Sequence, residues 1–307
     1  MQVPESLWDG EILTLPPALV RSYLSSLDRA GLTEAALSPR PEKAPVGGPS
    51  QEATDTHYAH AFDGSIARVQ LAFLDPHGQI PEAAKTLRRF ASGGGLCITD
   101  VPCGAGAGAL SLLCTVAELR ERGVLPREPL AVHLIGGEIS EPARAYAQEL
   151  VTSVTSSLEA QAIFLSAEFT SWNVLSEVSN TELVERIVVN KARFPQALLL
   201  ICNFSGFLER DGKKEEARKQ IDELFRFSSG GTNGAVWIEP DMRAAKNGLF
   251  PWIGRVLQRL PFFARVVGEA SVRETTAAKF RLPIRPDLTA NVRLCILPID
   301  LSRDVAV

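Results

Sequence analysis

The stretch that decides the fold is Leu96-Cys97-Ile98-Thr99-Asp100-Val101-Pro102-Cys103-Gly104-Ala105-Gly106-Ala107-Gly108. Its apolar start predicts a strand that ends at Asp100, and the glycines predict a tight turn. The apolar residues that follow, from Leu110 to Ala117, predict a helix. Glycine allows unusual backbone angles and lets a ligand approach without a Cβ in the way. A helix N-terminus also points free N–H groups at that ligand. The stretch therefore indicates a ligand-binding loop between a strand and a helix.

A second stretch, Ala131-Val132-His133-Leu134-Ile135-Gly136-Gly137-Glu138-Ile139-Ser140-Glu141-Pro142, follows the same plan. A strand is expected to end at Glu138, with Ser140 as the N-cap of the next helix and Pro142 in its first turn. An acidic side chain at the tip of the second strand can accept hydrogen bonds from both hydroxyls of a ribose. Glu138 is therefore the candidate ribose-binding residue.

Short apolar runs alternate with helical patterns from residue 96 onward. The expected strands are Leu96–Thr99, Ala131–Ile135, Ala162–Leu165, Ala197–Cys202 and Ala235–Ile238. The expected helices lie near 107–122, 141–157, 177–193, 212–227 and 249–260. Lys279–Pro283 and Val292–Pro298 predict two final strands joined by a turn. Continuous apolar strands that alternate with helices are typical of a parallel sheet covered on both faces. The fold class expected is α/β, Rossmann-like.

The N-terminal part, before residue 96, does not show this alternation of strands and helices. Residues 16–30 predict a short helix, and residues 38–52, with four prolines, predict a flexible linker. We expect residues 1–54 to form a helical extension with this linker, and residues 55–307 to form the main domain. Residues 55–92 predict two helices that act as a lid, with His57, Tyr58 and His60 at the start. These two histidines lack a third local ligand, so no metal site is expected.

Composition narrows the classes of protein. The 32 basic and 36 acidic residues give a net charge of −4, so the total does not indicate a nucleic-acid binder. Residues 241–307 nevertheless hold 11 basic and 6 acidic residues, which marks either a solvated face or a site for an anionic substrate. Five scattered cysteines favour a reducing, cytoplasmic setting. No signal peptide and no apolar run of membrane-spanning length is expected.

The two glycine-rich stretches resemble the first and second motifs of the class I S-adenosylmethionine (SAM)-dependent methyltransferases. Asp100-Val-Pro-Cys-Gly-Ala-Gly106 is similar to their Asp-x-Gly-x-Gly-x-Gly motif, except that Pro102 replaces the first glycine. Gly136-Gly-Glu-Ile-Ser-Glu-Pro142 is similar to the motif in which an acid precedes Ile-Ser. The resemblance covers about residues 95–300. It implies a seven-stranded, mostly parallel sheet with helices on both faces and an antiparallel final strand.

The resemblance also implies a set of cofactor-binding residues. SAM is expected over the first loop, with its ribose on Glu138, its adenine near the end of the third strand and its methionine near the end of the fourth. The residues expected to bind it are Asp100, Pro102, Cys103, Gly104, Ala105, Gly106, Glu138, Ile139, Glu168, Phe169, Asn203 and, from the lid, Tyr58. No catalytic residue can be assigned, because methyl transfer depends mainly on position and on the cofactor.

Three alternatives remain open at this stage. The main hypothesis is a methyltransferase acting on a small molecule, with an anionic acceptor or RNA as other acceptors. Asn203-Phe-Ser-Gly206 lacks the Asp/Asn-Pro-Pro-aromatic motif and disfavours methylation of base amino groups in that style. A nicotinamide-dependent oxidoreductase is disfavoured by the glycine spacing and by the distance from Gly108 to Glu138. The third hypothesis is a catalytically silent scaffold that binds a protein or RNA. The sequence does not indicate an oligomeric state.

Overall fold

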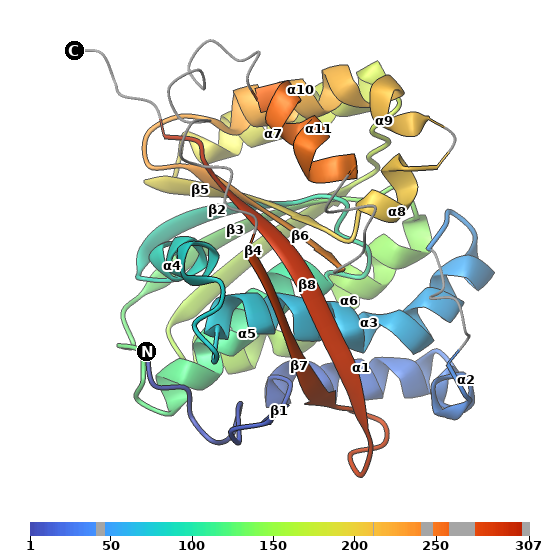
Figure 1. Cartoon of the computed structure of the whole chain (residues 1–307), viewed down its shortest axis with the longest axis vertical. Coiled ribbons are helices and arrows are strands. Elements are labelled where there is room, and N and C mark those ends of the chain that lie inside the picture. Colours follow the sequence, from blue (N-terminus) through green and yellow to red (C-terminus); the bar gives the residue numbers. More distant parts are fainter. Residues whose placement is uncertain (41–46, 211, 241–247, 258–273, 303–307) are drawn as a thin grey trace.

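A computed structural model describes residues 1–40, 47–210, 212–240, 248–257 and 274–302. The chain forms one mixed sheet between two layers of helices (Figure 1). The strands are β1 Ile12–Leu13, β2 Gly94–Asp100, β3 Leu130–Gly137, β4 Ile163–Thr170, β5 Gln196–Cys202, β6 Gly234–Pro240, β7 Glu274–Arg281 and β8 Thr289–Asp300. The helices are α1 Pro17–Arg29, α2 Thr33–Leu37, α3 Gln51–Leu74, α4 Pro81–Phe90, α5 Ala107–Glu121, α6 Glu141–Glu159, α7 Glu177–Lys191, α8 Ser205–Leu208, α9 Lys213–Glu216, α10 Arg218–Ser228 and α11 Phe250–Leu257.

The sheet has the strand order β1-β7-β8-β6-β5-β2-β3-β4. Strand β8 runs antiparallel between β6 and β7, and the other pairings are parallel. The α/β Rossmann-like class and the antiparallel final strand are therefore confirmed. Over the residues that the structure describes, the sheet has eight strands where seven were expected, because the short β1 pairs with β7 at the edge.

Alternating side chains of the central strands enter two separate cores. Leu198 and Leu200 of β5 pack in the core beneath α1, α3, α4, α5 and α6, while Leu199 and Ile201 pack beneath α7, α10 and α11. Figure 1 shows these two helix layers on opposite faces of the sheet. Because both faces are covered, both sets of alternating positions are apolar, which explains the continuous apolar runs in the sequence.

The order of the strands reverses at the centre of the sheet. Strand β2 lies between β3 on one side and β5 on the other, and both neighbours run parallel to it. The loops after β2 and β5 therefore leave the sheet in opposite directions. In open α/β sheets this reversal leaves a crevice at the carboxyl ends of the strands, where ligands bind. The glycine-rich loop follows β2, so the fold places it at this crevice.

Most predicted elements are confirmed, with adjusted ends. The helix predicted over 55–74 begins earlier, at Gln51, because the side chain of Ser50 caps it by accepting from the N–H of Ala53. The predicted helix 212–227 is two helices, α9 and α10, that meet at Ala217. Within the described residues, no helix has the length and apolar character needed to cross a bilayer.

Residues 41–46 of the predicted linker lie outside the described residues, so the expected flexibility of 38–52 stays a prediction. Helix α1, which precedes α2 and the linker, packs closely on the main body. Leu19, Tyr23 and Leu27 are buried in the same core as α3, α5 and α6. The division into an extension and a domain at residue 54 also stays a prediction.

Candidate functional site

The glycine-rich loop leaves β2 and enters α5 with two left-handed glycines. Gly104 has φ +52° and Gly106, the N-cap of α5, has φ +84°. A Cβ at Gly104 would meet no atom within 4 Å, so this side of the loop is open to a ligand. The N–H of Cys103 donates to Gly137 O at 3.0 Å, which fixes the loop against the end of β3. The two motifs seen in the sequence therefore form one structural unit.

Asp100 lies beneath the start of α5. Its Oδ2 accepts from the N–H of Ala109 at 2.9 Å, and a Cβ at Gly108 would lie 2.7 Å from the same oxygen. Gly108 is thus required for the close approach of the helix to the carboxyl group. Burial raises the pKa of Asp100 to about 7, against the opposing effect of the Ala109 N–H. The other oxygen, Oδ1, is buried without a hydrogen-bond partner.

Glu138 lies at the end of β3, as predicted, and bridges the two motifs. Its Oε2 accepts from the N–H of Gly104 at 3.1 Å, and its Oε1 accepts from the N–H of Ser140 at 2.9 Å. Burial raises the pKa of this carboxyl, while the two backbone N–H groups act in the opposite direction. A carboxylate has about four acceptor positions. Each oxygen of Glu138 therefore keeps capacity for a further donor.

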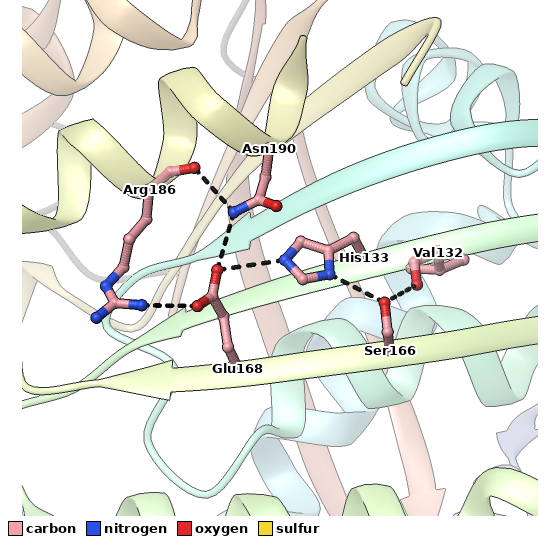
Figure 2. A network of polar contacts seen from close by, with 6 residues as sticks. All are labelled: Val132, His133, Ser166, Glu168, Arg186 and Asn190. Atoms are coloured by element: carbon pink, nitrogen blue, oxygen red, sulfur yellow. Dashed lines mark hydrogen bonds and ion pairs between the residues drawn. The ribbon is translucent and has the colours of Figure 1, made fainter. Parts of the chain in front are cut away.

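The predicted adenine residues point to opposite faces of β4. Phe169 lies beside the loop: a Cβ at Gly136 would come within 2.3 Å of its ring and 3.0 Å of Cys103 Sγ. Figure 2 shows Glu168 on the α7 side, where it accepts from Arg186 Nη1 at 2.7 Å and from Asn190 Nδ2 at 3.0 Å. Phe169 is thus close to the loop, and Glu168 is held by α7.

His133 completes this network on the α7 side of the sheet (Figure 2). Its Nδ1 lies 2.9 Å from Ser166 Oγ and its Nε2 lies 3.2 Å from Glu168 Oε1. Ser166 Oγ also donates to the Val132 carbonyl at 3.2 Å. These contacts tie β3, β4 and α7 together. His133 thus has two polar partners on β4, which its position within a predicted strand did not indicate.

Helix α3 crosses the carboxyl ends of β3 and β5. Near its start, Thr54 Oγ1 lies 2.7 Å from Ser140 Oγ, next to Glu138. Three turns later, Ser65 Oγ accepts from Asn203 Nδ2 at 3.1 Å. Sequence reasoning placed this segment over the cleft but did not identify Ser65. Its contact with Asn203 depends on tertiary structure and leaves no local signal in the sequence.

Tyr58 lies away from Asn203, in an aromatic cluster between helices. Its ring stacks on Tyr146 with centroids 4.3 Å apart and meets the edge of Tyr23 at 5.2 Å. The side chain is 1% exposed. In this position Tyr58 and Phe62 hold α3 against α1 and α6. The Tyr58 hydroxyl is buried without a hydrogen-bond partner among the described residues, and the assignment of Tyr58 as a cofactor contact stays a prediction.

Asn203 follows β5 in a left-handed conformation, with φ +57°. Its N–H donates to Ile238 O at 2.9 Å, and its Oδ1 is buried without a partner. The buried Glu239 holds the next residues: it accepts from the N–H groups of Phe204 and Ser205 and from Ser205 Oγ, at 2.8, 3.0 and 2.7 Å. Glu239 lies in β6, one residue before its end. It is the buried anchor of the loop that contains Asn203.

The remaining predicted cofactor-binding residues differ in their exposure to solvent. Pro102, Gly104 and Ala105 are partly exposed on the loop, Cys103 is buried, and Ile139 is 46% exposed beside Glu138. The peptide between Val101 and Pro102 is cis. In the part of the chain that the structure covers, no group of three His, Cys, Asp or Glu residues is arranged to hold a metal ion.

Comparisons with known proteins show similarity at the level of solved structures. No protein-family model and no curated protein matches the chain. Precorrin-6y C5,15-methyltransferase from Geobacter metallireducens is 11% identical, with a TM-score of 0.34 over 71% of this chain and 87% of that one. A candidate S-adenosyl-L-methionine-dependent methyltransferase from Methanococcus maripaludis is 14% identical, with a TM-score of 0.29 over 80% of this chain and 95% of that one. At these identities and TM-scores the similarity does not assign a function to this chain.

Proposed function

We propose that the protein is a SAM-dependent methyltransferase that binds its cofactor over residues 100–106. The observation that carries the proposal is the hydrogen bond of 3.1 Å between the N–H of Gly104 and Glu138. It joins a glycine-rich loop and an acidic strand end at the reversal point of the sheet. A nucleoside with a free ribose is the ligand that such a pair of elements recognises.

The side chains at the site fit the polar groups of SAM. Glu138 keeps acceptor capacity for the ribose hydroxyls, and Gly104 leaves room above the loop. Asp100 Oδ1 and Asn203 Oδ1 are buried acceptors without partners. An ammonium group is a suitable donor for such oxygens, because a buried acceptor without a partner costs free energy. SAM offers both a ribose and an ammonium group.

When bound, SAM supplies an activated methyl group that needs little help from acid–base side chains. The task left to the protein is to hold donor and acceptor in line and to exclude water. Glu239 fixes the loop of Asn203, and α3 closes over the carboxyl ends of β3 and β5. Because α3 restricts access to this edge, we propose a small-molecule acceptor.

Two findings separate this proposal from the nicotinamide alternative. The antiparallel β8, inserted between β6 and β7, is the feature that the methyltransferase resemblance implied. The glycines at 104, 106 and 108 also do not follow the dinucleotide fingerprint. Calorimetric titration with SAM, S-adenosylhomocysteine and NAD tests the proposal directly. Binding of NAD without binding of either SAM or its product would overturn it.

Two substitutions locate the site. Glu138→Ala removes a charged acceptor, so we expect a loss of about 1.5–3 kcal/mol in SAM binding, or roughly 10- to 150-fold in Kd. Gly104→Val places a branched residue at a left-handed position facing the ligand and should abolish binding. Glu141→Ala, on an exposed residue of the same segment, is the matched control. Unchanged SAM affinity in both test variants would place the cofactor elsewhere.

A further inference from the structure

Arg68 on α3 lies outside the predicted set of site residues and has few hydrogen-bond partners among the described residues. Its Nη2 lies 3.4 Å from Ser65 Oγ, which in turn accepts from Asn203 Nδ2. Arg68 is therefore linked through Ser65 to the loop that follows β5. Its positive charge also interacts electrostatically with Glu239 and Cys202, at the carboxyl ends of β6 and β5. A cation thus lies at the edge of the sheet where the cleft is expected.

The guanidinium of Arg68 is poorly satisfied. Its Nε is buried without a hydrogen-bond partner, and within the described residues it makes no ion pair. Asp63 lies nearby on the same helix, but this carboxylate pairs with Arg40. An arginine carries five N–H donors, and here one long contact to a hydroxyl is all that the described residues supply. Glu239 and Asp63 stabilise the charge of Arg68 from a distance, but burying such a group without an anion in direct contact is unfavourable.

An acceptor without a partner lies at the other end of the same chain of contacts. Asn203 donates through Nδ2 to Ser65, while its Oδ1 is buried and unpaired. The site thus offers a cation with free donors and an amide oxygen with a free acceptor position. The two are separated by one serine. Together they complement a carboxylate and a neighbouring ammonium, which are the two charged groups of an α-amino acid.

We propose that Arg68 forms an anion-binding subsite beside Asn203 that takes the carboxylate of an amino-acid group. The identity of the ligand rests on the proposed function, because the methionine part of SAM carries such a group and so can an acceptor. Arg68 has the fork geometry that binds a carboxylate through two parallel hydrogen bonds. Ser65 holds the guanidinium toward Asn203.

The first arm of the test asks whether the carboxylate belongs to the methyl donor. Binding of SAM and of decarboxylated SAM is measured by calorimetry for the full chain and for Arg68→Gln. If Arg68 holds the donor carboxylate, the wild type binds SAM about 10- to 100-fold more tightly than the decarboxylated analogue. Arg68→Gln should then bind both compounds with similar affinity, because the selective contact is lost.

The second arm asks whether the carboxylate belongs to the acceptor. The protein is saturated with S-adenosylhomocysteine, and malonate and inorganic phosphate are added as probe anions while the melting temperature is recorded. Stabilisation of the wild type but not of Arg68→Gln, with an unchanged preference in the first arm, assigns the subsite to the acceptor. If Arg68→Gln changes neither the preference for SAM nor the response to anions, the proposal is wrong.

Two further variants keep the result interpretable. Arg68→Lys retains the charge but loses the fork, so it should keep a few-fold preference and carries the test if Arg68→Gln does not fold. Arg21→Gln removes an exposed arginine of α1 and should behave like the wild type. If the wild type binds no form of SAM, the proposed function fails. The anion titration without S-adenosylhomocysteine then still tests Arg68.

Discussion

Removal of the Glu239 carboxylate is expected to destabilise the protein strongly. Glu239 is fully buried, and its Oε1 accepts from the N–H groups of Phe204 and Ser205 and from the Trp237 indole at 2.8, 3.0 and 2.6 Å. Its Oε2 accepts from Ser205 Oγ at 2.7 Å. Glu239→Ala leaves these donors in a site closed to solvent.

The magnitude follows from the number of donors left without an acceptor. Each buried donor without a partner costs about 1–3 kcal/mol, and the serine hydroxyl can rotate to another acceptor. Water entering the vacated volume recovers part of the remainder, so the net loss in the free energy of unfolding should be about 3–5 kcal/mol. Glu239→Gln keeps one carbonyl oxygen in place for the three N–H donors, so its cost should be about 1–2 kcal/mol.

Urea denaturation followed by tryptophan fluorescence measures both values. Glu177→Ala, on an exposed residue at the start of α7, is the control and should change stability by less than about 0.5 kcal/mol. SAM affinity should also fall in Glu239→Gln, because the loop of Asn203 loses its anchor. A Glu239→Ala protein within about 1 kcal/mol of the wild type would refute this account of the loop.

Three further predictions concern Gly136 and Asp100 at the site and Arg120 near the amino ends of β3 and β4. Gly136→Ala puts a Cβ within 2.3 Å of the Phe169 ring and should cost at least about 1–3 kcal/mol by thermal unfolding, whereas Gly206→Ala, which meets nothing within 4 Å, should be close to neutral. Arg120 donates to the carbonyls of Glu128 and Gln161 at 2.6 and 2.8 Å. Arg120→Met should therefore lower the free energy of unfolding by about 2–4 kcal/mol. A loss below about 0.5 kcal/mol would contradict the role of Arg120 as a bridge between loops. The pKa of Asp100 is raised from 3.8 to about 7 in the folded protein. Between these values the folded protein holds a proton that the unfolded chain releases. The contribution of Asp100 to stability is therefore present below pH 4 and is lost as the pH rises to 7. Unfolding free energies of the wild type and Asp100→Asn should therefore diverge in favour of the variant between pH 4 and 7 and run parallel above pH 7.5; parallel curves throughout would show that this carboxyl titrates normally.

The central strands and the glycine-rich loop could be predicted because their signals are local. Strand β5 is apolar at every position from Ala197 to Cys202, and the glycines of the loop follow directly from the end of β2. Strand β1 was not predicted because it has two residues, and its pairing with β7 depends on a distant segment. The spacing of apolar residues and the composition of the sequence give no signal for so short an edge strand.

The side chains around the site were less predictable for a related reason. Glu168 and Phe169 are neighbours in the sequence, but a strand sends them to opposite faces, and only the packing of α7 shows which face is which. Ser65 and Arg68 lie on a helix whose place over β5 is set by tertiary contacts. The sequence therefore predicted the backbone of the site and not the side chains that α3 adds to it.

The pairing of β1 with β7 has a consequence for the order in which the chain folds. Ile12 and Leu13 pair with Lys279 and Phe280, so strand β1 cannot pair until residues 279 and 280 have been synthesised. Leu13 is fully buried in the finished sheet. Contacts between segments this far apart slow folding, because a long loop must close before they form. During synthesis the segment of Ile12 and Leu13 therefore lacks its β7 partner for a long time and gains from protection against aggregation.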